Sequence, residues 1–111
     1  WLQQRDGYRC LVLGDLGELG DNAAPLHASI GLQVKNAAIE SLFCCGQLSA
    51  NTSEAFGSEH FCAQEPLIVA LQKQLASTTG NITVLVKGSR SAAMERVVDS
   101  LLDAYGRGEL V

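Results

Sequence analysis

The sequence predicts an α/β fold in which a mostly parallel sheet lies between layers of helices. Short apolar runs that end at glycine alternate along the chain with helical patterns. In the clearest example, the apolar run 10–13 stops at Gly14 and opens into an acidic, glycine-rich loop that reaches Gly20. A strand, such a loop and a helix are the opening unit of a parallel sheet, and ligands bind in such loops at the carboxyl ends of strands.

The composition indicates one globular domain. The chain has 111 residues, of which 47% are hydrophobic and 18% charged, which excludes a disordered tail. The formal net charge of -4 argues against nucleic acid as a partner. No apolar run approaches the roughly 18 residues of a membrane span. Because the chain begins at Trp1 without a methionine, residues 1–111 are expected to be one domain of a longer protein, with residues 1–7 ending an upstream helix at Gly7.

The four cysteines match no C-x-x-C zinc or redox spacing. Cys10, Cys44 and Cys45 fall in predicted strands, where a free cysteine behaves as a small apolar residue. Buried, reduced thiols in a cytoplasmic protein are the preferred interpretation, with a disulfide or a metal role as the alternative for all four, Cys62 included.

The first half of the chain is expected to form strands at 9–13 and 41–45, the second ended by Gly46. Asp21 or Asn22 would cap the helix between them. In that helix Leu26, Ile30 and Val34, four residues apart, would form the apolar stripe. A short helix is expected from Ser49 to about Phe56, stopped by Gly57, followed by a short strand around Phe61.

The second half is expected to form a helix that starts near Glu65 and Pro66, a strand at 83–86 and a long final helix. The strand is apolar after Thr83, which favours a central place in a parallel sheet. Ser91 would cap the final helix. The inward residues are expected to be Leu67, Ala70, Leu71 and Leu75 in the first helix and Met94, Val97, Val98, Leu101 and Leu102 in the last.

Two loops carry the chemically useful side chains. The loop after the first strand offers the carboxylates of Asp15 and Glu18. The loop after the strand at 83–86 offers Lys87, Ser89, Arg90 and Ser91. If the two loops meet at one sheet edge, opposite charges face one crevice, which suits a zwitterion whose carboxylate or phosphate lies at the basic loop. The alternative is that the acids are solvated and form ordinary salt bridges with Lys87 and Arg90.

Other kinds of site are less well supported. The glycines of the first loop follow G-x-x-G-x-x-G, which is not the dinucleotide fingerprint, and no G-x-x-x-x-G-K-[ST] loop occurs. His27 is expected to form structural hydrogen bonds, with catalysis as the less favoured role. His60 lies in no motif. Cys62 has no evident base partner that would make it a nucleophile.

The motifs resemble the Mur ligase family, and within it the C-terminal domain of the ligases that add D-alanyl-D-alanine. The residues that carry the resemblance are Val-Leu-Gly-Asp-Leu-Gly-Glu-Leu-Gly at 12–20, His27 with Gly31, Val-Leu-Val-Lys-Gly-Ser-Arg-Ser at 84–91 and Met-Glu-Arg-Val-Val at 94–98. Cys45-Gly46, Ala55-Phe56-Gly57 and His60-Phe61 also fit, while Leu16, Ala92 and Ala93 depart mildly from the pattern.

The resemblance implies a three-layer Rossmann-like domain of a three-domain, ATP-dependent amide-bond ligase of bacterial peptidoglycan synthesis, located in the cytoplasm. Its substrates would be UDP-N-acetylmuramoyl-tripeptide, D-alanyl-D-alanine and ATP. ATP and magnesium would be held mainly by a central domain that is absent here, so this piece alone should be inactive. The substrate- or ATP-binding residues would be Asp15, Glu18, His27, Lys87, Ser89, Arg90 and Ser91, with His27 supporting the acidic loop.

Two alternatives stay open. The chain could be the C-terminal domain of a sister Mur or folylpolyglutamate-type ligase with another amino-acid substrate, although the Lys-Gly-Ser-Arg-Ser loop argues against it. It could instead be a non-catalytic binding module with a Rossmann-like fold, because one fold hosts many functions.

Overall fold

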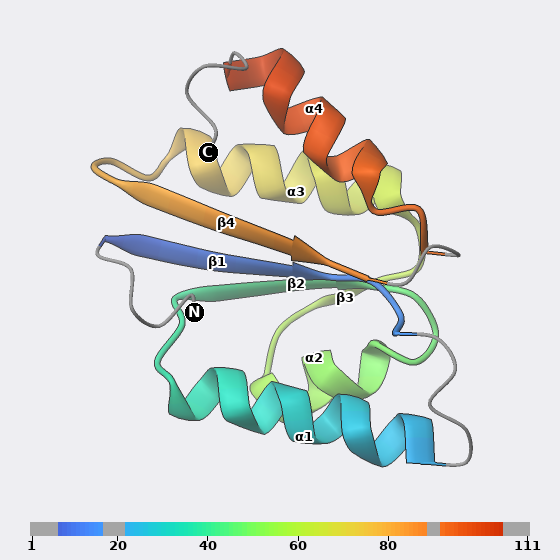
Figure 1. The fold of residues 1–111 in the computed structure, drawn as a ribbon. Helices are drawn as coiled ribbons and strands as arrows, with labels where there is room; N and C mark the ends of the chain where they lie inside the picture. The colour runs from blue at the N-terminus through green and yellow to red at the C-terminus, as the bar shows by residue number, and fades with distance from the viewer. Residues whose placement is uncertain (1–6, 17–21, 89–91, 106–111) are drawn as a thin grey trace.

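The chain forms a single sheet between two pairs of helices, as a computed structural model shows (Figure 1). The structure describes residues 7–16, 22–88 and 92–105. The predicted tail of an upstream helix before Gly7 therefore lies outside the described residues. The elements are β1 (Tyr8–Leu13), α1 (Ala23–Asn36), β2 (Ser41–Cys45), α2 (Ala50–Phe56), β3 (His60–Phe61), α3 (Gln64–Ala76), β4 (Ile82–Lys87) and α4 (Glu95–Tyr105). None of the described helices is long and apolar enough to cross a membrane.

Within these described residues the sheet has four strands in the order β3-β2-β1-β4, and every neighbouring pair is parallel. Helices α1 and α2 cover one face, and α3 and α4 cover the other (Figure 1). The predicted α/β class with three layers is therefore confirmed. Parallel strands need such helical crossovers, because each chain segment must return to the same end of the sheet before the next strand begins.

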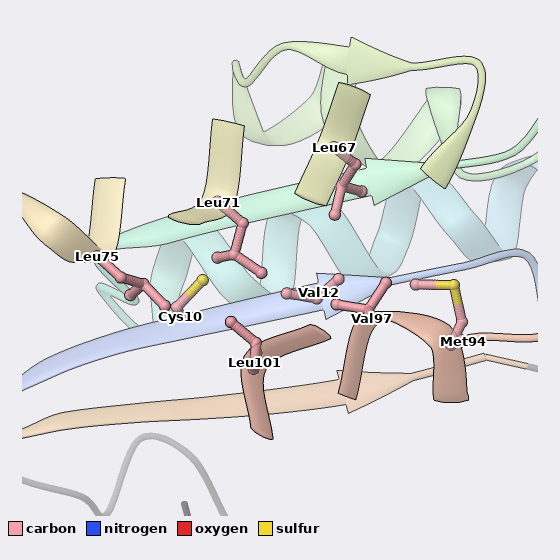
Figure 2. Close-up of a cluster of buried hydrophobic side chains, with 8 residues drawn as sticks. All are labelled: Cys10, Val12, Leu67, Leu71, Leu75, Met94, Val97 and Leu101. Atoms are coloured by element: carbon pink, nitrogen blue, oxygen red, sulfur yellow. The ribbon is translucent and has the colours of Figure 1, made fainter. Parts of the chain in front are cut away.

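β1 is buried on both faces, and its alternating side chains supply two cores. Cys10 and Val12 face α3 and α4, where they meet the buried side chains of Leu67, Leu71, Leu75, Met94, Val97 and Leu101 (Figure 2). Leu11 and Leu13 face the other layer, in a cluster with Val34, Ile39, Leu42 and Cys44. Since burial of each large apolar side chain contributes about 1.5–3 kcal/mol, these two clusters hold β1 at the middle of the domain.

The chain reverses its direction across the sheet beside β1. The first crossovers carry it from β1 to β2 and β3, and the return through α3 brings β4 to the opposite side of β1. β1 and β4 end at the same sheet edge, and the helices that follow them in sequence, α1 and α4, lie on opposite faces (Figure 1). Ligands of open parallel sheets bind at such a switch point, so the topology directs attention to the carboxyl ends of these two strands.

The predicted apolar stripe of α1 is wrong at one position. Leu26 is 44% exposed, and the buried residues of the helix are His27, Gly31 and Val34. The reason is the close approach of α2: a Cβ atom on Gly31 would collide with the backbone of Thr52. The helix therefore turns its glycine-containing face inward, and Leu26 is left at the surface.

The predicted central place of β4 is not found among the described strands. In the described part of the chain, β4 lies at the outside of the sheet beside β1, and its residues from Ile82 to Val86 are only half-buried. Its apolar residues are explained by the two helical layers, since Val84 packs against one core and Leu85 against the other. In α4, likewise, Val98 is 38% exposed although it was expected to face inward.

Most element boundaries agree with the predictions to within one or two residues. β1 and β4 each extend beyond the expected ranges, and the short strand expected around Phe61 is His60–Phe61. The helix expected from Ser49 is α2, with Ser49 at its N-cap and Gly57 after it in the left-handed conformation, at φ +94°. Asn22 stands at the N-cap of α1, but its side chain makes no capping hydrogen bond.

Candidate functional site

A shallow hollow lies at the carboxyl edge of the sheet, close to the switch point. Its volume is about 200 Å³, and the described residues that line it are Asp15, Cys45, Gly46 and Ala92. These residues come from the segment after β1, from the end of β2 and from the segment before α4. The hollow therefore lies where the sequence predicts that the acidic and basic loops meet.

Asp15 is held in place by the start of α2. Its Oδ1 atom accepts a hydrogen bond from the backbone amide of Ser49 at 2.7 Å, and Oδ2 accepts one from the amide of Leu48 at 3.1 Å. Charged acceptors make strong hydrogen bonds with amides, so the carboxylate joins the segment after β1 to the β2–α2 turn. Each oxygen retains acceptor capacity, and the carboxylate also borders the hollow.

Gly46 is required beside this carboxylate for two reasons. Its backbone has φ +120°, a conformation that L-residues with side chains rarely adopt, and a Cβ atom here would collide with the Asp15 carboxylate. Its carbonyl oxygen accepts hydrogen bonds from His60 Nε2 at 2.6 Å and from Ser49 Oγ at 3.2 Å. The ends of β2 and β3 and the start of α2 are thereby joined around the hollow.

His27 is fully buried, and its side chain binds a backbone amide at the start of the acidic loop. Its Nε2 atom accepts a hydrogen bond from the amide of Leu16 at 3.1 Å. Its Nδ1 atom lies 2.7 Å from the carbonyl oxygen of Ala23 and donates to it, because a carbonyl can only accept. Both ring nitrogens thus bind backbone groups, which is the kind of structural contact that the sequence predicts for His27.

The basic loop begins against the acidic one. Lys87 ends β4 with an exposed side chain, and its carbonyl oxygen accepts a hydrogen bond from the amide of Gly14 at 2.8 Å. Met94 packs onto Gly14 and Gly88 so closely that a Cβ atom on either glycine would meet its side chain. The first residues of the two loops are thus neighbours, as the sequence predicts.

Of the seven predicted site residues, the structure describes Asp15, His27 and Lys87; Glu18, Ser89, Arg90 and Ser91 lie outside the described residues. Within the described part, Asp15 binds backbone amides and forms no ion pair with Lys87. Sequence reasoning missed Cys45, Gly46 and Ala92 as lining residues. A signal was present for Gly46, since a glycine directly after a strand commonly marks a tight approach at the sheet edge.

The thiols near the site are poor nucleophiles. Burial raises the pKa of Cys44 to about 11, and burial followed by the negative charges of Asp15 and Cys62 raises the pKa of Cys45. The expectation of buried thiols holds for Cys10 and Cys44, whereas Cys62 is exposed. In the described residues, no three His, Cys, Asp or Glu side chains gather in a way that could hold a metal ion.

Known proteins match this chain both in sequence and in fold. The chain is 45% identical over 101 residues to the UDP-N-acetylmuramoyl-tripeptide–D-alanyl-D-alanine ligase of Escherichia coli K12, a match that covers 90% of this chain and 22% of that enzyme. The chain is homologous to the C-terminal portion of the MurF ligases. The ligase of the same name from Buchnera aphidicola is 38% identical over 102 residues, which cover 91% of this chain and 22% of that enzyme.

Solved MurF structures agree. A crystal structure of MurF from Acinetobacter baumannii superposes with a TM-score of 0.83 at 26% identity, over 92% of this chain and 24% of the MurF chain. A second crystal structure of the same protein gives a TM-score of 0.84. No protein-family model matches the chain. The chain spans about a fifth of the length of the MurF relatives that it matches.

Proposed function

We propose that residues 1–111 form the C-terminal domain of an ATP-dependent amide-bond ligase of bacterial peptidoglycan synthesis. The complete enzyme, a cytoplasmic protein of three domains, would join D-alanyl-D-alanine to UDP-N-acetylmuramoyl-tripeptide. The observation that carries this proposal is the 45% identity to the E. coli ligase over nine-tenths of the chain, which includes both loop motifs. The domain would close over the central domain and complete the site there.

The geometry of the sheet edge supports a zwitterionic dipeptide as the ligand. Asp15 borders the hollow with a carboxylate that retains acceptor capacity, and the exposed Lys87 leaves the neighbouring strand at the same edge. An ammonium would bind on the acidic side, and a carboxylate or a phosphate on the basic side. A bound and oriented amine is what an amide ligase needs, because holding the nucleophile in place removes much of the entropic barrier.

The proposed division of roles follows the charges. Lys87, Ser89, Arg90 and Ser91 would bind the carboxylate of the dipeptide or the phosphates of ATP. Asp15 and Glu18 would face the amine. His27 would not touch substrate; it would hold the acidic loop through the amide of Leu16.

ATP would activate the carboxylate of the tripeptide as an acyl phosphate, and magnesium would neutralise the phosphate charges. The described residues do not fit a magnesium site, because no suitable cluster of ligands is present among them. We therefore assign the metal to the central domain. The domain formed by residues 1–111 would supply contacts only to the dipeptide and to part of the nucleotide.

The test is phosphate release by the complete protein that contains this chain, supplied with ATP, magnesium, the UDP-linked tripeptide and D-alanyl-D-alanine. Release that requires the tripeptide and the dipeptide together is the expected result. L-alanyl-L-alanine serves as the matched control for the dipeptide, and single amino acids test the sister-ligase alternative. Activity with a single amino acid in place of the dipeptide, or folded protein with no activity on any of them, would contradict the proposal.

A further inference from the structure

The side chain of Gln64, the first residue of α3, binds Ala92 and Ala93 in the segment before α4. Its Nε2 atom donates to the carbonyl oxygen of Ala92 at 2.6 Å and to that of Ala93 at 3.0 Å. The amide orientation is unambiguous on chemical grounds, because both partners are carbonyls and only the NH₂ end of the side chain can donate. Gln64 and Ala92 are 28 residues apart in sequence, so α3 fixes a segment that it does not adjoin along the chain.

The held segment has an unfavourable backbone conformation. Ala93 has φ +52°, in the left-handed region that residues with a Cβ atom rarely occupy. Its carbonyl oxygen accepts from the Arg96 amide as well as from Gln64, so this conformation forms the first turn toward α4. Non-glycine residues keep such conformations where surrounding contacts over-determine them, and these positions concentrate at functional sites.

The orientation that forms these two hydrogen bonds is unfavourable for the other polar atom of the Gln64 side chain. Its Oε1 atom is buried and has no hydrogen-bond partner among the described residues. A buried unpaired acceptor is unfavourable, so a glutamine serving only to start α3 would gain by turning to solvent. The arrangement is explained if the valuable interaction is the one with Ala92 and Ala93.

The position of this segment matters because it follows the basic loop directly. The loop begins where the Lys87 carbonyl accepts from the Gly14 amide, and it ends at Ala92, which lines the hollow. Met94 then packs onto Gly14 and Gly88. Gln64 therefore holds Ala92 at the hollow, while the Gly14 amide of the segment after β1 holds the Lys87 carbonyl.

We propose that Gln64 is a positioning residue for substrate binding: by holding Ala92 and Ala93 it fixes the side of the hollow that Ala92 lines. This inference rests on the proposed function, in which the dipeptide or ATP binds at this sheet edge. Gln64 acts through the backbone and touches no substrate.

The decisive variant is Gln64→Glu in the complete ligase, with Gln74→Glu as its control. Both changes introduce the same charge on α3, but Gln74 is exposed. A carboxylate cannot donate to the two carbonyls, so the KM for D-alanyl-D-alanine or for ATP should rise about five- to ten-fold, in line with the loss of a buried hydrogen bond. The KM for the UDP-linked tripeptide should not change, because another domain binds it.

Melting temperatures measured beside the KM values separate a positioning role from a purely structural one. A purely structural loss would lower the melting temperature and the amount of active enzyme, with every KM unchanged. That outcome, or a Gln64→Glu enzyme indistinguishable from Gln74→Glu, would overturn the inference.

Gln64→Met decides the matter if Gln64→Glu does not fold. Methionine has a similar length but no donor, and it also removes the buried, unpaired Oε1 atom, so the melting temperature should change little while the same KM increases about five-fold. An unchanged KM would overturn the inference. Wild-type enzyme without ligase activity would instead overturn the proposed function, which separates the two failures.

Discussion

The imidazole of His27 joins the first turn of α1 to the loop after β1, since it accepts from the Leu16 amide at 3.1 Å and donates to the Ala23 carbonyl oxygen. This buried ring satisfies the Leu16 amide and links it to the helix. The contact predicts that His27 stabilises the domain.

His27→Ala should lower the free energy of unfolding by about 2–4 kcal/mol, because it removes a fully buried side chain and leaves an amide and a carbonyl unpaired. Urea denaturation of the complete protein measures the loss. Leu26→Ala is the matched control at the neighbouring, exposed position and should change stability by less than about 1 kcal/mol. Equal effects of the two substitutions would show that the hydrogen bonds of His27 contribute nothing.

Gly46→Ala should destabilise the domain more than Gly57→Ala. Both glycines have positive φ, at +120° and +94°, so each substitution brings conformational strain of about 1–2 kcal/mol. Only at position 46 does the new Cβ atom collide with the Asp15 carboxylate, whereas nothing lies near it at position 57. Chemical denaturation should separate the two variants by at least about 1 kcal/mol. A reversed order would mean that the turn at Gly46 relaxes freely.

The buried thiols predict a loss of stability in alkali. Burial raises the pKa of Cys10 and of Cys44 from 9.0 to about 11. Between these values the unfolded chain has released the thiol protons and the folded chain has not, so stability falls as the pH rises. The full effect above pH 11 is about 2–3 kcal/mol per thiol.

Unfolding free energies at pH 8 and pH 10.5 measure this effect. Cys10→Ala and Cys44→Ala should each weaken the pH dependence, although they also lower stability at pH 8. In the native protein at pH 8, a thiol reagent should modify Cys62 first and Cys10 and Cys44 only on unfolding. Rapid modification of all four thiols would contradict the burial.

Under the proposed function, Lys87→Ala should lower the ligase turnover of the complete protein at least about ten-fold. The melting temperature should not change, because the side chain is exposed and its loss disturbs no core. Lys73→Ala, an exposed lysine on α3, is the control and should be silent in both measurements. A melting temperature that falls together with activity would argue that Lys87 has only a structural role.

The sequence by itself determined the class of the fold and the residues of the strands. Apolar runs ended by glycine located β1, β2 and β4, and Gly57 was foreseen as the stop of α2. These features depend on local chemistry: strand periodicity, the conformational freedom of glycine and the residues that helices accept at their ends. The motif resemblance likewise needed only the linear order of residues, and the comparisons support it.

Tertiary structure decided what local patterns leave open. The outer place of β4 and the exposure of Leu26 depend on which layers pack against each element, and four-residue spacing cannot reveal that a helix will turn Gly31 toward its neighbour. The hydrogen bonds of Asp15 to the start of α2 and of Gln64 to Ala92 join residues 28 to 34 positions apart. Such partners are chosen when the layers assemble, because a buried polar group binds whichever donor or acceptor the packing brings to it.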